Sequence, residues 1–515
     1  MPDPRSPDAQ GVCFPLGGDD RRSTSATGRA IFADSIRAID PAIAARIEHT
    51  RDWRKGYIPP LRDIVLAAAQ STENALSISR HGLASAEQRF TFRRGDAEVP
   101  LHQATSAFDS RGLASVTVRG RAASEGELSV PYKGGRLFGD ELRRQVDSWV
   151  SRGIAEPSFG AAMHLVLDNP DWMDLRDIDI ALLGAGAEMA PTRSLLRWGA
   201  RVHAVDLPRP GIWERLTAIT RNTAGSLRIP IALDDDGNPP FVVEGDVHPD
   251  DDATICGAAG VDLIAQMPEI RTWLAETEQP FVLGTYAYAD GAQHVRLSMA
   301  SDAIVTSLVG QRNDITLAYL ATPTDVFVVP MECVDASRKR WENRGIGSLF
   351  QAPLRIARQF EPNYPNVHAT ASGTSVGLND SIIPQQGPNY ILAKRIQRWR
   401  ALVARADGIP VSLNLAPATR TRSVVRNRAL AAAYAGADRF GVEVFDPSTS
   451  TTLMAAMLVH DLRNPTSTAH PETPLDNPMD LFVSGANHGG LWRAAYAPRS
   501  VLGIAAVLGM FESRA

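Results

Sequence analysis

Tyr390 and Lys394 lie four positions apart in the segment GPNYILAKRIQRW, residues 387–399. Side chains at positions i and i+4 of a helix share one face, so the phenol and the ammonium group would lie side by side. A free phenol has a pKa of about 10, and a nearby positive charge favours its ionised form, which suits the pair to proton transfer. The chain contains only four lysines, so this spacing rarely arises by chance. The alternative is structural, with a half-buried tyrosine beside a solvated lysine.

A second chemical motif lies in DIDIALLGAGAEMAPTRSLLRWGARVHAVDL, where two apolar runs flank a glycine turn and a helical stretch. Gly184 and Gly186 allow a tight turn and the close approach of a ligand to the backbone at the start of a helix. Met189 stands where this kind of turn usually has a third glycine. Asp206 ends the second apolar run, where a carboxylate accepts hydrogen bonds from ribose hydroxyls and repels a 2′-phosphate. The unit predicts a dinucleotide site that favours NAD over NADP, with contacts from Gly184, Gly186, Glu188, Met189 and Asp206.

Strand-like apolar runs alternate with helical segments in the second half of the chain. The runs are PFVLGTYAY, DITLAYLATPTDVFVVP, GIPVSLNLAP and RFGVEVF, and segments such as HVRLSMASDAIVTSLVGQR lie between them. This alternation predicts a doubly wound α/β fold, in which helices cover both faces of a parallel sheet. We divide the chain into a disordered tail (1–28), an α-rich accessory region (29–170) and a Rossmann-like domain (171–515).

Three later segments follow the order of one dehydrogenase family. VVEGDV places Asp246 and Val247 after the expected third strand, and DITLAYLATPTDVF places Thr322 and Thr324 at the end of the expected fifth strand. Tyr390 then begins a run that continues to the loop PATRT, residues 417–421. In this order of segments, over about residues 176–445, the chain resembles the short-chain dehydrogenases/reductases.

The resemblance implies a role for the pair described first. Tyr390 would exchange a proton with the substrate oxygen while a nicotinamide exchanges hydride with carbon. Lys394 would lower the pKa of Tyr390 and hold the nicotinamide ribose, and the hydroxyl of Thr322 or Thr324 would polarise the carbonyl. The further cofactor contacts that it implies, with NAD or NADP as the cofactor, are Asp246, Val247, Thr285, Pro417 and Thr419.

The chain also departs from this family pattern. Thr324 lies far ahead of Tyr390, which implies an insertion at about residues 326–386 that is either a substrate lid or an oligomer contact. The helix before the fifth strand lacks the family's asparagine, and Gly284-Thr285-Tyr286 replaces its Asn-Asn-Ala-Gly. Two alternatives stay open: an S-adenosylmethionine-dependent methyltransferase, which uses a similar glycine turn and acid, and a catalytically inert dinucleotide-binding protein.

Composition argues against several other classes. The net charge is −5 and the arginines are interspersed with acids, so nucleic acid is not an expected partner. Cys13, Cys256 and Cys333 lack disulfide or metal spacing, which indicates a reducing cytoplasm and no metal site. The apolar run SVLGIAAVLGMF (500–511) is too short to span a bilayer, and we expect a buried helix there.

The sequence therefore predicts a cytoplasmic NAD(P)-dependent oxidoreductase that interconverts a carbonyl and an alcohol of a small molecule. We expect no stable membrane insertion, and a homo-oligomer stays open.

Overall fold

The computed structural model describes residues 3, 6, 8–108, 112–234, 236–241, 251–344 and 358–512. The expected adenine contacts Asp246 and Val247 lie outside the described residues.

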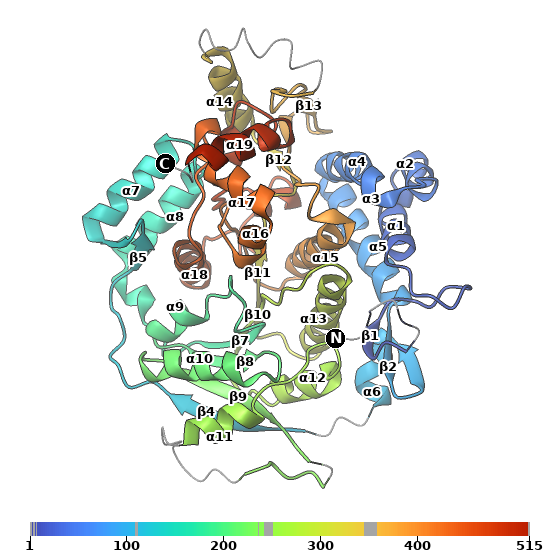
Figure 1. Ribbon diagram of the computed structural model, residues 1–515, viewed down its shortest axis with the longest axis vertical. Helices are drawn as coiled ribbons and strands as arrows, with labels where there is room; N and C mark the ends of the chain where they lie inside the picture. Colours follow the sequence, from blue (N-terminus) through green and yellow to red (C-terminus); the bar gives the residue numbers. More distant parts are fainter. Residues whose placement is uncertain are drawn as a thin grey trace.

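A seven-stranded sheet forms the centre of the molecule (Figure 1). Its order is β15-β11-β10-β7-β8-β9-β4, and all neighbours are parallel except β4, which is antiparallel to β9. In chain order the six parallel strands read 3-2-1-4-5-6, the order of dinucleotide-binding folds. The predicted doubly wound α/β fold is therefore confirmed. The strands are β4 (Leu113–Arg119), β7 (Asp179–Leu183), β8 (Arg201–Val205), β9 (Ser226–Ala232), β10 (Phe281–Thr285), β11 (Ile315–Ala321) and β15 (Val411–Leu415).

Helices cover both faces of this sheet, so its strands are apolar on both sides. In β7, Ala181 and Leu183 belong to one apolar cluster, whereas Ile180 and Leu182 belong to the other. The first cluster continues into α12, α13 and α15, and the second into α8, α10 and α18, on opposite sides of the sheet (Figure 1). The helices are α8 (Pro157–Asp168), α9 (Thr192–Arg197), α10 (Pro210–Arg221), α11 (Asp252–Ala258), α12 (Met267–Ala275), α13 (Ala292–Val309), α15 (Gly387–Ala406) and α18 (Pro447–Arg463).

The N-terminal region is divided between two sides of the sheet. Its first five helices form one group, which contacts α15 through α1, α3 and α5, and the missing side chain of Gly82 leaves room there for the ring of Trp399. These helices are α1 (Thr24–Arg37), α2 (Pro41–Glu48), α3 (Trp53–Gly56), α4 (Ile58–Ala69) and α5 (Thr72–Arg89). α7 (Gly139–Ser151) packs instead with α8 in the second cluster, and β4 joins the main sheet. The predicted boundary near residue 170 therefore does not separate the sheet from the N-terminal region.

The segment predicted as a disordered tail contains ordered structure. β1 (Gly11–Cys13) pairs antiparallel with β2 (Thr91–Arg94), which pairs with β3 (Ala97–Pro100). Phe14 is buried, and its ring lies 4.8 Å from that of Phe90. The prediction of disorder is wrong for residues 11–28, because the apolar side chains of Val12 and Phe14 bury against the helical region.

The predicted insertion forms a small layer of its own. β12 (Val326–Val329), β14 (Ser375–Asp380) and β13 (His368–Ala369) make a three-stranded antiparallel sheet, and α14 (Met331–Glu342) packs on it. RFGVEVF, which was expected to be a strand, is a 3₁₀ turn (Ala437–Phe440) followed by irregular chain.

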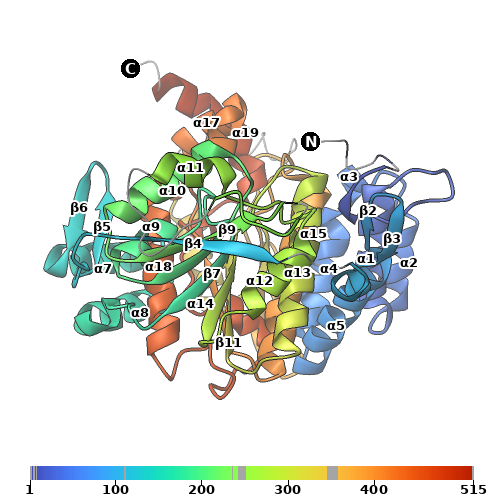
Figure 2. The same ribbon diagram turned by 90° about the horizontal axis from the view of Figure 1, so that it is seen from below.

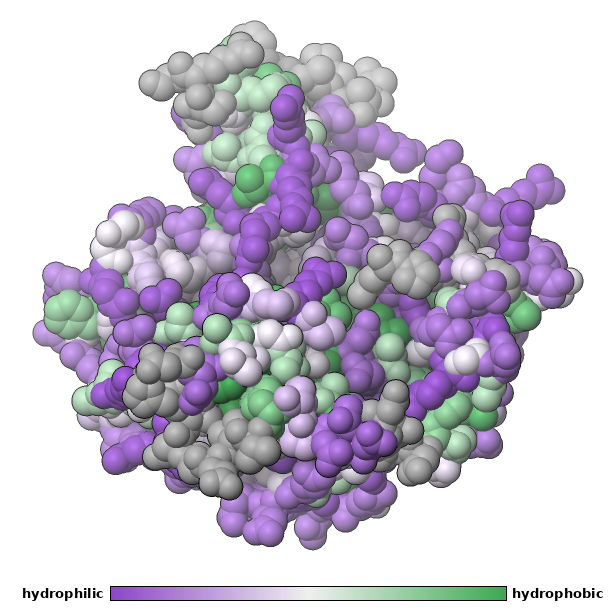
Figure 3. All heavy atoms as spheres, turned by 60° about the horizontal axis from the view of Figure 1, so that its bottom comes forward, coloured by the Kyte–Doolittle hydropathy of each residue, from purple (hydrophilic) through white to green (hydrophobic). Residues whose placement is uncertain are grey.

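The C-terminal part ends in two adjacent helices, α17 (Arg428–Ala435) and α19 (Pro498–Glu512), with α16 (Arg422–Arg426) just before α17. In Figure 2 both rise above the body of the molecule, and the end of α19 lies farthest out. The expectation of a buried helix over SVLGIAAVLGMF is only half correct, because Val507, Leu508 and Phe511 are exposed. Hydrophilic residues cover most of the face seen in Figure 3, with hydrophobic ones between them. Within the described ranges, no helix combines the length and hydropathy that a bilayer-spanning segment needs.

Candidate functional site

The candidate site lies where the parallel strands end. Leu183 of β7 is in register with Thr285 of β10, and the strand order reverses between these two strands. Ligands of open α/β sheets bind outside the carboxyl ends of the strands at such a reversal. Gly184 follows β7 with φ +92°, and a Cβ there would lie 2.5 Å from backbone atoms of Ala287. Glycine is therefore required where the first turn meets the segment after β10.

Tyr390, Thr322 and Thr324 meet at the carboxyl end of β11. The Tyr390 hydroxyl interacts with the side chain of Thr322, whose Oγ1 lies 3.0 Å from Oγ1 of Thr324. Gln386, just before α15, donates its side-chain amide to Thr324 Oγ1 at 2.6 Å. The insertion thus leaves the sheet after Thr324 and returns beside it. The three hydroxyl residues singled out in the sequence are brought together, and Gln386 was missed.

Two aromatic residues that the sequence analysis did not identify surround the phenol. The Tyr390 ring lies edge-on to His294, with ring centroids 5.3 Å apart, and to Tyr288 at 6.3 Å. His294 is buried, and neither ring nitrogen has a hydrogen-bond partner among the described residues. Burial, assisted by the charge of Lys394, holds its pKa well below the usual value. The imidazole is therefore neutral at physiological pH.

Lys394 does not donate to the phenol. Its Nζ donates to the carbonyl oxygen of Leu320 at 3.1 Å and to Gln397 Oε1 at 3.0 Å. Burial lowers the pKa of Lys394 to about 8, against an opposing effect of Asp325. Burial also raises the pKa of Tyr390 to about 12, although the interaction with Thr322 acts in the other direction. The expectation that Lys394 lowers the pKa of Tyr390 is not met, and the phenol stays protonated at neutral pH.

A buried ion cluster fixes α15 against the end of β11. Asp325 accepts hydrogen bonds from Arg395 and, at 2.8 Å, from Arg398. The Arg398 guanidinium lies 4.4 Å from the ring centroid of Phe327 and 4.1 Å from that of Phe482. Burial raises the pKa of Asp325, but the two guanidinium groups outweigh it and hold that pKa below its usual value. Because Tyr390 and Lys394 are on the same helix, this cluster also positions them.

The glycine turn and Asp206 contact each other directly. The backbone N–H of Gly186 donates to Asp206 Oδ2 at 2.7 Å, and that of Leu207 donates to Oδ1 at 2.8 Å. Burial raises the pKa of Asp206, and these two bonds oppose the rise. The expected helix does not start at the glycines, because α9 begins only at Thr192. The turn therefore offers backbone groups and a carboxylate, without a helix N-terminus directly behind the glycines.

Contacts at the edge of the sheet connect this turn to the tyrosine. Glu188 accepts the backbone N–H of Arg422 at 2.8 Å and pairs with its guanidinium at 3.5 Å. The next residue, Ser423, lies close enough to influence the pKa of Tyr288, which donates its hydroxyl to Asp290 at 2.8 Å and whose ring lies beside Tyr390. The first turn, the start of α16 and the tyrosine cluster therefore line one edge of the sheet.

The other residues predicted to contact the cofactor are buried or partly buried. Thr285 is buried, and its hydroxyl has no hydrogen-bond partner among the described residues. The Thr419 hydroxyl donates to the carbonyl of Pro417 at 2.8 Å and lies 2.7 Å from the Ser450 hydroxyl, so it faces α18. Met189 packs partly buried against the second apolar cluster. β9 ends at Ala232, well before the VVEGDV segment that was expected to follow the third strand.

An apolar cavity of about 70 Å³ begins at Thr324. Its walls come from α17, α19 and the chain between α18 and α19, and they include Tyr434, Val501, Leu502 and Leu491. Thr324 therefore belongs both to the hydroxyl cluster and to the wall of this cavity.

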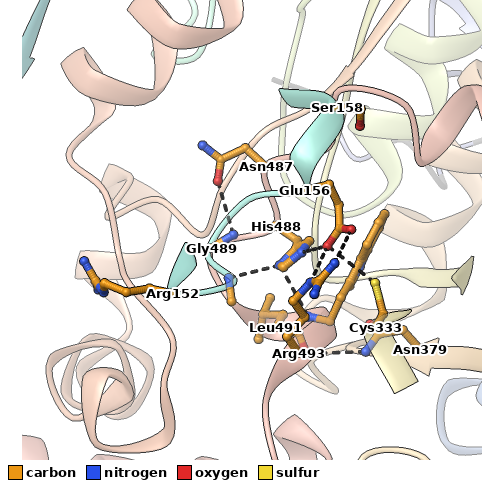
Figure 4. A network of polar contacts seen from close by, with 12 residues as sticks. Arg152, Glu156, Ser158, Cys333, Asn379, Asn487, His488, Gly489, Leu491 and Arg493 are labelled. Carbon is orange, nitrogen blue, oxygen red and sulfur yellow. Dashed lines mark hydrogen bonds and ion pairs between the residues drawn. The ribbon is translucent and has the colours of Figure 1, made fainter. Parts of the chain in front are cut away.

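A buried polar network fixes one wall of this cavity (Figure 4). Glu156 accepts two hydrogen bonds from Arg493, at 2.9 and 2.7 Å. His488 Nδ1 accepts the backbone N–H of Gly490 at 3.0 Å, so its Nε2–H donates to Glu156 Oε1 at 2.8 Å. Cys333 Sγ lies 3.4 Å from the same carboxylate oxygen. His488 thus has a structural role, because the network holds the loop that carries Leu491.

No family model and no curated protein matches the chain. Among solved structures, it is similar to a thiolation-reductase di-domain from an archaeal non-ribosomal peptide synthetase, with 13% sequence identity and a TM-score of 0.26. The match covers 54% of this chain and 66% of that chain, just under two thirds of its length. A likeness this weak supports no conclusion about activity.

Proposed function

We propose that this protein is an NAD(P)-dependent oxidoreductase that interconverts a carbonyl and an alcohol. The observation that carries the proposal is the position of the Tyr390 hydroxyl. It interacts with the side chain of Thr322 at the carboxyl end of β11, in a sheet whose strand order is that of dinucleotide-binding folds.

Three features fit a dinucleotide. Gly184 has no side chain at the reversal of strand order. Each oxygen of Asp206 accepts one backbone N–H, which leaves lone pairs for ribose hydroxyls. The buried hydroxyl of Thr285 at the end of β10 lacks a partner among the described residues. We infer that the cofactor lies across the ends of β7, β8 and β10, and that Asp206 favours NAD over NADP.

A bound nicotinamide would supply or accept hydride at the substrate carbon. In carbonyl reduction, Tyr390 donates its hydroxyl proton to the substrate oxygen and takes a proton back from water afterwards. The pKa of about 12 keeps that proton on the phenol at neutral pH. Thr322 orients the phenol, and Lys394, which has two of its three N–H donors engaged, keeps one for the cofactor ribose. The apolar cavity at Thr324 supports a substrate whose carbonyl is attached to an apolar group.

Ligand titration followed by thermal unfolding tests the cofactor. NADH should raise Tm more than NADPH at equal concentration, and S-adenosylmethionine should not raise it. Asp206→Ala should narrow or reverse the NADH preference. If the wild type binds NADPH at least tenfold tighter, a difference of about 1.4 kcal/mol, the role of Asp206 is wrong. Stabilisation by S-adenosylmethionine alone would instead favour the methyltransferase alternative.

Turnover of apolar aldehydes and ketones, followed by NADH absorbance, tests the chemistry. Tyr390→Phe should lower kcat by about 10²- to 10⁴-fold while NADH binding stays intact. Tyr319→Phe is the control, since it also removes one tyrosine hydroxyl, but one that is buried and has no hydrogen-bond partner among the described residues. If Tyr390→Phe keeps full turnover, the catalytic role is wrong. NADH binding by the wild type without turnover of any carbonyl would support the inert alternative.

A further inference from the structure

α17 and α19 form a tightly packed antiparallel pair. A Cβ on Gly436 would collide with the carbonyl oxygen of Ala505, and a Cβ on Gly509 would collide with that of Ala432. Residue numbers thus rise along one helix as they fall along the other. The first turn of α17 therefore lies beside the last turns of α19, at the end that projects farthest from the body in Figure 2.

This projecting end is apolar and exposed. Val507, Leu508 and Phe511 of α19 are 48%, 38% and 66% exposed, and Val425 of α16 is 52% exposed. More than half of the large apolar side chains that are exposed among the described residues lie on α16 and α19. No charged residue occurs from Ser500 to Phe511. Single exposed apolar residues are ordinary on protein surfaces, whereas a cluster of them indicates a binding surface.

Positive charge flanks the apolar end. Arg426 ends α16 and Arg428 begins α17, and both are exposed. Arg428 is in the first turn of α17, which lies beside the last turns of α19. The chain has no acidic residue between Asp407 and Asp438. Arg422, which pairs with Glu188, belongs to the same basic stretch. Glu512, which ends α19, is the one acid in the sequences of α16, α17 and α19, so arginine outnumbers acid at this end although the net charge of the chain is −5.

We propose that this end of the α16–α17–α19 unit docks on the surface of an anionic lipid bilayer. Arginine beside exposed Leu and Phe is the composition of helices that bind at the membrane–water interface. The exposed stretch Val507–Phe511 is about 6 Å long at 1.5 Å per residue. If the end of α19 enters the bilayer along the helix axis, this length matches the depth of about 5–10 Å to which interfacial helices bury their apolar residues. A second copy of this chain fits less well, because symmetric pairing would bring the same arginines together.

Such docking is peripheral and requires no spanning helix. It does not rest on the proposed reaction, because Arg426, Arg428 and Phe511 have no assigned role in that reaction. The other ends of α17 and α19 line the apolar cavity at Thr324, so docking would bring this cavity near the membrane surface.

Vesicle co-sedimentation of the full-length protein tests the docking. Vesicles of phosphatidylcholine with phosphatidylglycerol should bind the protein, pure phosphatidylcholine vesicles should bind it far less, and salt should weaken binding. Arg426→Gln with Arg428→Gln should weaken binding roughly 30-fold, at about 1 kcal/mol for each arginine. The matched control is Arg144→Gln with Arg338→Gln, which removes the same charge from exposed sites on α7 and α14.

Leu508→Ser with Phe511→Ser should also lower binding, by roughly tenfold or more, without lowering Tm, because both side chains are exposed. Leu165→Ser, at an exposed apolar position on α8, is the control for that change. Leu508→Trp adds a reporter whose fluorescence should shift to the blue on anionic vesicles. Equal binding to both vesicle types, or equal losses in the controls, would overturn the proposal. The proposal would also be overturned if the wild type bound no vesicles but formed a dimer in sedimentation velocity, and if Leu508→Ser with Phe511→Ser dissociated that dimer.

Discussion

Replacement of Lys394 by methionine tests the partly buried ammonium on which the candidate site depends. The pKa of Lys394 is lowered to about 8 by burial, whereas a lysine in an unfolded chain titrates at about 10.4. Between these values the unfolded chain holds a proton that the folded protein has released. Stability from this group therefore rises with pH across that window, and at neutral pH the full cost of the buried charge is present.

The size of the effect follows from the two pKa values. They correspond to about 3 kcal/mol over the whole window, of which about 2 kcal/mol is gained between pH 7 and pH 9.5. Lys394→Met keeps the length of the side chain but removes the charge and this pH dependence. It also removes the hydrogen bonds to Leu320 and Gln397, at about 1 kcal/mol each. We expect the variant to be about 1 kcal/mol more stable than the wild type at pH 7 and less stable than it at pH 9.5.

Urea unfolding of both proteins at pH 7, 8.5 and 9.5 measures the difference. Lys339→Met, which replaces an exposed lysine on α14, should follow the wild type at each pH. If the difference between the wild type and Lys394→Met does not change by at least 1 kcal/mol from pH 7 to pH 9.5, Lys394 is not buried as the structure places it. The variant should also bind NADH more weakly, because the proposed ribose contact is lost while the fold is kept.

Three further results are expected. Gly184→Ala should lower the free energy of unfolding in urea by roughly 2–4 kcal/mol, because the φ of Gly184 is positive and a Cβ would press on the backbone after β10. The control is Gly211→Ala on α10, where no atom lies within 4 Å of the added Cβ and no loss of stability is expected. Glu156→Gln should lower the free energy of unfolding by about 3 kcal/mol at pH 7. Arg493 and His488 hold the pKa of Glu156 below its usual value, so the stabilisation by this carboxylate is lost as it becomes protonated, and the difference between variant and wild type should shrink as pH falls below about 4.5. Alcohol oxidation should become about tenfold faster for each pH unit between 6 and 9, since it needs the Tyr390 phenolate; a flat profile would contradict the raised pKa of Tyr390.

The sheet could be predicted from the sequence because each strand carries its own signal. The runs at β7, β10 and β11 are almost continuously apolar, since both faces are buried, and helical segments separate them. β8 and β15 carry polar residues but are still rich in Val and Leu. The run RFGVEVF was predicted wrongly because its composition is that of a strand. Its apolar residues lie instead in a 3₁₀ turn and in the irregular chain that follows. β1 was missed because a short strand at the edge of a glycine-rich and charged stretch has little local signal.

The candidate site could be predicted only where chemistry is local. The spacing of Tyr390 and Lys394 is a property of one helix, and so is their placement on α15. Asp325, Arg395 and His294 act through burial and through partners far along the chain, and no local pattern reveals that. For the same reason the sequence suggested a lysine that activates the phenol, whereas the structure directs its ammonium to a strand carbonyl.

The different surroundings of Tyr390 and Lys394 decide which reaction the pair suits. Both side chains leave the same face of α15, but the phenol turns to Thr322, beyond the end of β11, and the ammonium turns one residue inside that end, to Leu320. Burial then raises one pKa and lowers the other, so both groups resist ionisation. A phenol that keeps its proton is a ready acid and a poor base at neutral pH. In the proposed reaction, the same burial that weakens the lysine as an activator of the phenol would therefore favour carbonyl reduction over alcohol oxidation.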